Sequence, residues 1–277
     1  YVLRYKKTCA FCMGGLSVLA FAPRFWVIFD FFSFSYLLHL LIVTKERKAL
    51  FKIGYAFGFA HFAFGLAWIG NALLIDAKQF GWLYPITLIA FGAFFGLFFA
   101  VPAVCTYFAR TKWQKWLAFS SCFVLFEWVR SFIFTGFPWN LMGYTLAFSD
   151  ELIQTVSLGG TYLLSLIAVM SYSILGILSK KSLLPSCLFM LLVYGIVWGF
   201  GYWRIKNIKT EDSEIVVRLV QPSIPQEMKW DRSVREQNFI EHIALSSEDG
   251  LIVPDLIVWG ETASPFVLDR DEYHREI

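Results

Sequence analysis

Long apolar stretches are the feature that most constrains how this chain folds. Seven of them, separated by short polar segments, follow one another between the N-terminus and about residue 205. A helix of about 20 apolar residues matches the hydrocarbon thickness of a bilayer, so such runs are typical of transmembrane helices. The stretches cover residues 8–23, 25–44, 49–74, 80–108, 114–135, 158–179 and 183–203. We therefore predict a membrane domain of about seven transmembrane helices over residues 1–205.

Composition supports this prediction and limits the classes of function. Of the 277 residues, 57% are hydrophobic and 16% are charged, whereas soluble domains are about half apolar and about a quarter charged. The net charge of +3 does not indicate a nucleic-acid partner. Cys9 and Cys12 have the spacing of a redox or metal pair, but no second pair or histidine cluster accompanies them. We therefore predict no metal, no cofactor and no disulfide framework.

The charges of the loops predict the orientation of the spans. Lysine and arginine gather at the N-terminus and in the second, fourth and sixth loops, whereas the other loops have few. Basic loops remain in the cytoplasm. The basic residues of the three loops are Lys45, Arg47, Lys48, Lys52, Arg110, Lys112, Lys115, Lys180 and Lys181. Seven spans would then place everything after about residue 205 on the outer face.

Two features inside the spans each permit two interpretations. Gly54/Gly58 and Gly92/Gly96 are spaced four apart, either because helices pack closely there or because glycine is common in membrane helices. Glu127 and Arg130 lie one helical turn apart at membrane depth. They are either functional charges or a structural ion pair near the interface.

The sequence changes character after about residue 210. Residues 215–221 are a β-branched run that predicts a buried strand, residues 232–248 have the spacing of an amphipathic helix, and residues 255–259 predict a second strand. This order is the start of an α/β layer. We predict that residues 206–277 begin a soluble domain, with too few residues to bury a core of their own.

Glu261 is the candidate catalytic residue, because it directly follows the second predicted strand. Strand ends are where α/β folds place reacting groups. A carboxylate beside Trp259 has a position suited to a general base with a raised pKa. The alternative is an ordinary solvated glutamate in a turn. Trp139 lies in the loop after the fifth apolar stretch, and tryptophan is typical of anchors at the membrane interface.

Several ordered blocks over nearly the whole chain resemble the apolipoprotein N-acyltransferase family. They are LAFAP at 19–23, GLAWI at 65–69, FEWVR at 126–130, TGFPWNLMGY at 135–144, Gln154 with GGTY at 159–162, VQPSIPQ at 220–226, KWD at 229–231 and DLIVWGETA at 255–263. Each block is weak alone, but their order and spacing make the resemblance strong.

The resemblance implies an enzyme that moves a fatty acyl chain from a phospholipid to the N-terminal amine of a lipoprotein's lipidated cysteine. Its partners would be a phospholipid donor, a diacylated apolipoprotein acceptor and the bilayer. It would be a multi-pass protein of the bacterial inner membrane, with a periplasmic nitrilase-like α-β-β-α domain and a Glu–Lys–Cys triad. Glu261 matches the family's general base and Trp230 a substrate-binding tryptophan. Trp139 would lie beside the lipid-facing cavity and also bind substrate.

Two departures from the family pattern affect these expectations. Gly260 stands where the family usually has proline, which frees the backbone before Glu261. The family's catalytic lysine and cysteine and its closing membrane helix would lie beyond Ile277, and Lys229 is not assigned the lysine's role. We therefore expect a C-terminally truncated member that is inactive as a separate chain.

Two other functions remain as alternatives. A membrane transporter or lipid-binding module would contain an inverted repeat or broken helices at the midplane, and no convincing repeat is found. Another membrane-tethered nitrilase-like amidase would use the same glutamate, Glu261. The loop of residues 137–139 and the blocks in the spans argue against that amidase.

Overall fold

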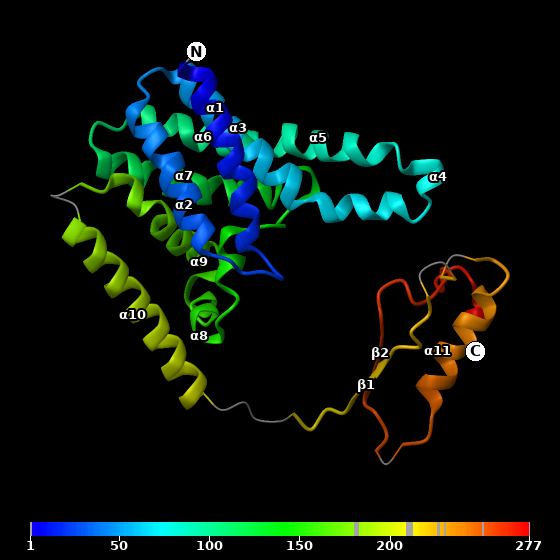
Figure 1. The fold of residues 1–277 in the computed structure, drawn as a ribbon. Helices are drawn as coiled ribbons and strands as arrows, with labels where there is room; N and C mark the ends of the chain where they lie inside the picture. The colour runs from blue at the N-terminus through cyan, green and yellow to red at the C-terminus, as the bar shows by residue number, and fades with distance from the viewer. Residues whose placement is uncertain are drawn as a thin grey trace. The chain divides into compact units, whose positions relative to one another are not determined.

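The computed structural model describes residues 2–179, 183–208, 213–225, 228–229, 231–250 and 252–276. The chain divides into two compact units, Tyr1–Ile208 and Lys209–Ile277. We call them the helical unit and the C-terminal unit. The ribbon in Figure 1 shows that the first consists of helices and that the second contains both strands.

Each predicted apolar stretch overlaps at least one helix of the helical unit. The long helices are α1 Val2–Ser17, α2 Ile28–Val43, α3 Arg47–Gly65, α5 Leu83–Phe95, α6 Leu97–Cys105, α7 Lys112–Arg130, α9 Val156–Ser173 and α10 Leu183–Asn207. The short ones are η1 Val18–Ala20, η2 Ala67–Leu74, α4 Ala77–Phe80, η3 Thr106–Phe108, η4 Ile133–Thr135, η5 Met142–Leu146, α8 Asp150–Ile153 and η6 Ile174–Ile177. In Figure 1, η2 and α5 extend side by side and are joined at α4.

Three helical segments of the described residues are long and apolar enough to cross a membrane. They are Leu83–Phe108, Val156–Ile177 and Leu183–Asn207. A fourth is added if α3 and η2, which meet at 41°, form one bent span. The helix α2 is apolar but has only 16 residues. The chain is therefore a helical protein with several membrane-spanning candidates, and the number seven stays a prediction.

Aromatic rings fill the interior of the helical unit. Phe57 of α3 and Phe99 of α6 have ring centroids 5.0 Å apart, and Phe123 of α7 lies 4.7 Å from Phe99. Phe34 of α2 meets Phe57 edge-on at 5.4 Å. Tilted and edge-to-face contacts of this kind are favourable beyond the apolar area they bury. One aromatic core therefore joins four helices.

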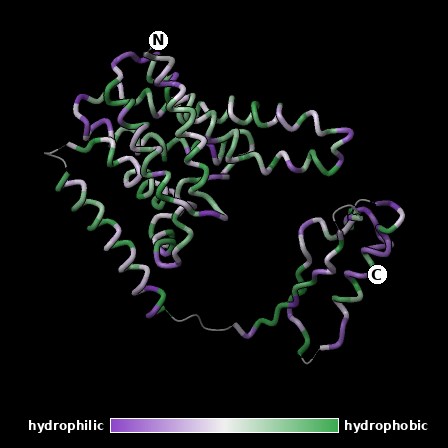
Figure 2. Tube along the Cα trace, in the orientation of Figure 1, coloured by the Kyte–Doolittle hydropathy of each residue, from purple (hydrophilic) through white to green (hydrophobic). Residues whose placement is uncertain are grey.

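The outer surface of α10 is apolar as well. Figure 2 shows hydrophobic residues along this helix. Leu184, Leu191 and Ile196 are 67%, 75% and 61% exposed. Water would make such a continuous apolar face unfavourable, whereas lipid tails would not. The face supports a membrane location for α10.

Close approach between helices explains the glycine pairs. A Cβ on Gly54 would lie 2.5 Å from the Cβ of Ala103, and one on Gly58 would lie 2.7 Å from the Cβ of Phe99. A Cβ on Gly92 would lie 2.8 Å from a backbone oxygen of α3. These separations are shorter than van der Waals contact, so any side chain would push the helices apart. The structure favours the packing interpretation.

Gly58→Ala is expected to destabilise the helical unit by about 1–3 kcal/mol, because the added methyl group overpacks the contact between α3 and α6. The thermal unfolding midpoint of the purified chain in detergent measures the change. Gly195→Ala in α10 is the matched control, since a Cβ there would meet no atom within 4 Å. Equal midpoints for the two variants would contradict the packing interpretation.

The C-terminal unit contains β1 Val217–Val220, α11 Arg235–Ser247, β2 Leu256–Trp259 and α12 Glu272–Glu276. The strands pair in parallel, from Val217 opposite Leu256 to Val220 opposite Trp259. Phe239 of α11 is buried and packs edge-to-face on Trp259, with ring centroids 5.8 Å apart. The predicted strand–helix–strand order is confirmed.

The predicted burial of the first strand is wrong. Leu219 is 76% exposed and Val217 is 46% exposed. The helix α11 packs on this sheet, but the exposure of Leu219 and Val217 shows that the face carrying them has no covering layer among the described residues. A two-stranded sheet does not establish an α-β-β-α sandwich, and that fold stays a prediction.

Candidate functional site

Glu261 lines a cavity of about 300 Å³ in the C-terminal unit. The cavity is lined by the loop after β1, which includes Pro222 and Ser223, and by the loop after β2, which includes Glu261 and Thr262. The two strands are parallel, so their carboxyl ends and the loops that follow them meet at one edge of the sheet. This geometry gives the glutamate a cavity in which to act, and its catalytic role stays a prediction.

Both loops of the cavity contain a residue in the left-handed backbone region. Ser223 has φ 58° and Thr262 has φ 54°. A residue other than glycine pays about 1–3 kcal/mol for such a conformation, and such residues cluster at functional sites. The strain lies on both sides of the cavity and supports its interpretation as a site.

The surroundings of position 260 are not crowded enough to require a glycine. A Cβ there would meet no atom within 4 Å, and its backbone is not in the left-handed region. Position 260 therefore has room for a side chain before Glu261. We find no steric reason for glycine at this point.

The helix α11 supplies two polar residues to the cavity that sequence reasoning missed. Asn238 and His242 are only 7% and 5% exposed, and both line the cavity. The Asn238 side chain donates to the carbonyl oxygen of Met228 at 3.0 Å. This bond holds the loop that carries Lys229 against α11. Asn238 and His242 are four residues apart on the buried face of the amphipathic helix α11, beside Phe239. This spacing could have identified them from the sequence.

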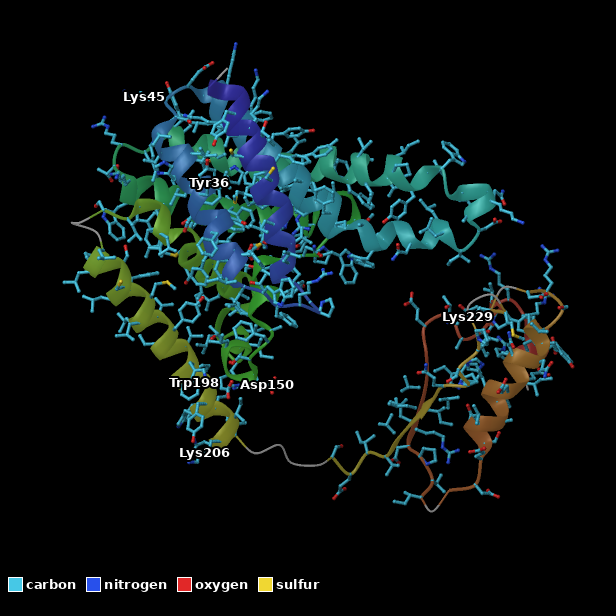
Figure 3. All side chains as sticks on the ribbon, viewed as in Figure 1. Tyr36, Lys45, Asp150, Trp198, Lys206 and Lys229 are labelled. Atoms are coloured by element: carbon cyan, nitrogen blue, oxygen red, sulfur yellow. The ribbon has the colours of Figure 1, made fainter. Side chains whose placement is uncertain are left out.

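Lys229 lines the same cavity as Glu261. Figure 3 labels this lysine, in the loop before α11. Trp230, the second predicted substrate-binding residue, lies outside the described residues. The structure therefore brings Lys229 and Glu261 to one cavity and leaves the role of Trp230 a prediction.

Glu127 and Arg130 bind the loop that follows α7 and do not bind each other. Both are buried. Arg130 Nη1 donates to the carbonyl oxygens of Phe137 at 2.9 Å and Trp139 at 2.6 Å, and Glu127 Oε1 accepts from the Met142 backbone at 2.8 Å. No ion pair within 4.0 Å joins the two side chains, both of which are described. The ion-pair interpretation is wrong because buried backbone groups of the loop need these charges as partners.

Trp139 is half exposed and packs edge-to-face against Trp68 of η2, with ring centroids 5.8 Å apart. The neighbouring Asn140 donates its side-chain N–H to the carbonyl oxygen of Gly65 at 3.2 Å. Residues from two family blocks thus form one aromatic surface of the helical unit. The predicted contact of Trp139 with substrate stays a prediction.

His274 of α12 connects the segment after Glu261 to the helix α11. Its Nδ1 lies 2.7 Å from Asp271 and its Nε2 3.0 Å from Glu236 of α11. Burial alone would lower the pKa of His274, but the hydrogen bonds to Glu236 and Asp271 outweigh it and raise the pKa above its ordinary value of 6.5. The protonated ring therefore ties α12 to α11.

The stability of the C-terminal unit is expected to fall as the pH rises above about 6.5, the ordinary pKa of histidine. A raised pKa means that the folded chain holds the proton more tightly than the unfolded chain. The stabilisation from His274 is then present below about pH 6.5 and is lost as the pH rises through the folded pKa. Urea unfolding followed by tryptophan fluorescence measures this, and the variant His274→Gln should lose most of the pH dependence. An unchanged dependence in the variant would contradict the assignment.

No group of three or more His, Cys, Asp or Glu side chains in the described part of the chain is arranged to hold a metal ion. Cys9 and Cys12 of α1 are free thiols.

Sequences of known proteins match both units of the chain. A family model for the apolipoprotein N-acyltransferase N-terminal domain covers residues 13–174. Apolipoprotein N-acyltransferase of Rickettsia typhi is 39% identical over 94% of this chain and 52% of its own length. Its counterpart in Brucella melitensis is 37% identical over 95% of this chain and 53% of its own length. The counterpart in Agrobacterium fabrum is 34% identical over 96% of this chain and 53% of its own length. The chain spans about half the length of the curated relatives it matches.

Proposed function

This chain belongs to the apolipoprotein N-acyltransferase family, and from that premise we propose that it contributes to acylation of the N-terminal amine of lipoproteins. The acyl donor would be a phospholipid, and the acceptor the lipidated N-terminal cysteine of a diacylated apolipoprotein. The observation that carries the proposal is the position of Glu261 in the lining of a cavity, directly after the carboxyl end of β2. The family block DLIVWGETA contains this residue.

The proposed chemistry is covalent catalysis in two steps. Glu261 takes the proton of a cysteine thiol, and the thiolate attacks an ester carbonyl of the phospholipid. The C–O bond breaks, the proton passes to the departing lysophospholipid and a thioester remains. The lipoprotein amine then attacks the thioester, the C–S bond breaks, and the proton lost from nitrogen passes by way of Glu261 to the thiolate. The lysine of the triad would stabilise the oxyanion in each step.

The proposal places the helical unit in the inner membrane. Seven spans with basic loops in the cytoplasm would bring the C-terminal unit, as the start of a nitrilase-like domain, to the periplasm. In support, Lys115 donates to the carbonyl oxygens of Leu41 and Ile42 at the end of α2. Basic residues of the fourth loop thus lie near the second loop, on the side where the positive-inside rule requires them.

One observation that the transporter hypothesis anticipated is present, but it does not favour that function. The backbone of α9 departs from helical angles at Gly159 and Gly160, and α3 and η2 meet at 41°. Both breaks fall in sequence blocks that the family shares. The family model matches both segments, so the breaks do not favour a transporter over a member of this family.

The 277 residues alone are expected to form no N-acylated product, because they contain no cysteine after Cys187 to serve as nucleophile. Mass spectrometry of a diacylated lipopeptide, incubated with the purified chain and phospholipid vesicles, measures the product. A chimera of residues 1–277 with the remaining half of the Rickettsia typhi relative is the positive control and should be active. Product from the short chain would contradict the thioester mechanism, and an inactive but folded chimera would contradict the proposed function.

A further inference from the structure

The hydrogen bond of His242 determines which of its ring nitrogens carries the proton. Nδ1 lies 2.7 Å from the backbone carbonyl oxygen of Asn238. Because a carbonyl oxygen only accepts, Nδ1 must donate. In the neutral ring the single proton is then on Nδ1, and Nε2 has a free lone pair.

The orientation of the ring is set by its neighbours. His242 packs against Trp259, with ring centroids 5.1 Å apart. Trp259 Nε1 donates to the hydroxyl of Ser246 at 2.8 Å, and that hydroxyl donates to the carbonyl oxygen of His242 at 2.6 Å. This closed network joins α11 to β2. A group held in this way needs no reorganisation when a ligand binds.

The free nitrogen faces away from the helix. Nδ1 points to the backbone of α11, so Nε2 lies on the far side of the ring. His242 is 5% exposed and lines the cavity shared by Glu261 and Lys229. No hydrogen bond to Nε2 is found from any described residue. An acceptor without a described partner beside a cavity is available to a donor from a ligand.

We propose that His242 is a substrate-binding residue of this site, whose neutral Nε2 accepts a hydrogen bond from the amine of the acyl acceptor. The proposal rests on the function proposed above. One N–H of the amine donates to Nε2, and its lone pair stays directed at the acyl carbon while the Glu261 carboxylate takes the proton that nitrogen loses. Asn238 is a positioning residue, because its carbonyl oxygen orients the ring and its side chain holds the loop of Lys229.

The polar groups of the cavity suit the N-terminus of a peptide. Glu261 and His242 are acceptors, and the Lys229 ammonium is a donor without acceptor capacity. A peptide N-terminus presents the complementary pattern, an amine next to a carbonyl oxygen. The amine would face the two acceptors, and the first carbonyl oxygen would face Lys229. A ligand without the amine would lose the bond to Nε2.

Nitrogen NMR of the imidazole rings tests the proposal in the 277-residue chain held in lipid nanodiscs. The chain has 4 histidines, so the His242 signals are assigned by their loss in His242→Phe. We expect the Nδ1–H tautomer in the free chain. A diacylated lipopeptide with a free N-terminal amine should shift the Nε2 signal toward that of a hydrogen-bonded nitrogen. The matching lipopeptide with hydrogen in place of the amine should leave it unchanged.

The binding affinities of the same two lipopeptides give a second measurement. His242→Phe keeps an aromatic ring against Trp259 but removes the acceptor. It is expected to weaken binding of the amine lipopeptide about five- to tenfold, as the loss of one hydrogen bond does, without changing binding of the lipopeptide that lacks the amine. His274→Gln is the control, because this imidazole does not line the cavity of Glu261.

Two results would overturn the assignment of His242 and leave the proposed function standing. One is a proton on Nε2 in the free chain, and the other is equal weakening of both lipopeptides by His242→Phe. If the native chain does not bind the amine lipopeptide at all, the proposed function fails, and the ligand assigned to His242 fails with it.

Discussion

Glu261→Gln is expected to lower acyl transfer by about 10²–10⁴-fold, the usual effect of losing a general base. The amide has nearly the same shape as the carboxylate but does not take up a proton. The measurement is the initial rate of lipopeptide acylation by the chimera of residues 1–277 with the remaining half of the Rickettsia typhi relative. Substrate binding should change less than the rate, because the effect falls on the chemical step.

A matched control separates the proton transfer from a general loss of negative charge. Glu248 is an exposed carboxylate at the end of α11 that does not line the cavity. Glu248→Gln should keep the native rate within about twofold, since surface substitutions of this kind have small effects. Because the Glu261 side chain is exposed, Glu261→Gln should also leave the unfolding midpoint unchanged. A loss of less than about tenfold would contradict the role of general base.

Arg130→Met is expected to destabilise the helical unit by about 3–5 kcal/mol, more than any other single change considered for this unit. The substitution removes two hydrogen bonds from a charged donor to the carbonyl oxygens of Phe137 and Trp139. It also removes a cation one helical turn from the buried carboxylate of Glu127. Thermal unfolding of the purified chain in detergent measures the loss.

Two further variants determine the cause of that loss. Arg24→Met removes an exposed arginine whose contact is with the face of Trp26, and it should cost less than about 1 kcal/mol. Adding Glu127→Gln to Arg130→Met should recover part of the stability, because a neutral amide still accepts from Met142 without leaving a buried charge unpaired. Similar midpoints for Arg130→Met and Arg24→Met would show that the loop does not depend on Arg130.

Local pattern predicted the elements of this protein well. The seven apolar stretches each overlap a helix, because a helix satisfies its own backbone hydrogen bonds and depends mainly on its own residues. The strand–helix–strand order after residue 210 was also predicted, since alternation and turn residues act over short distances. The place of Glu261 at the end of a strand followed from the same reasoning.

The partners of individual side chains were not predictable in this way. Spacing on a helix left an ion pair between Glu127 and Arg130 as one of two interpretations, yet their hydrogen-bond partners are backbone atoms of a loop that the pattern does not position. The burial of Leu219 depends on how many layers cover the sheet. The residues of its strand do not determine the number of layers. Asn238 and His242 had a detectable spacing on α11, but only the fold shows that they share a cavity with Glu261.

The sequence by itself determined the family, the helices and the strand end that carries Glu261, because these depend on residue type and order along the chain. Only the tertiary structure decided that the glycine pairs are helix contacts, that Arg130 holds the loop of Trp139 and that His242 lines the cavity of Glu261. These features depend on distances in space between particular atoms, which residue type and order do not specify, and a hydrogen bond or a close contact exists only when those distances are realised. The long apolar stretches thus determine which segments form helices, and contacts made in the folded chain determine what those helices hold in place.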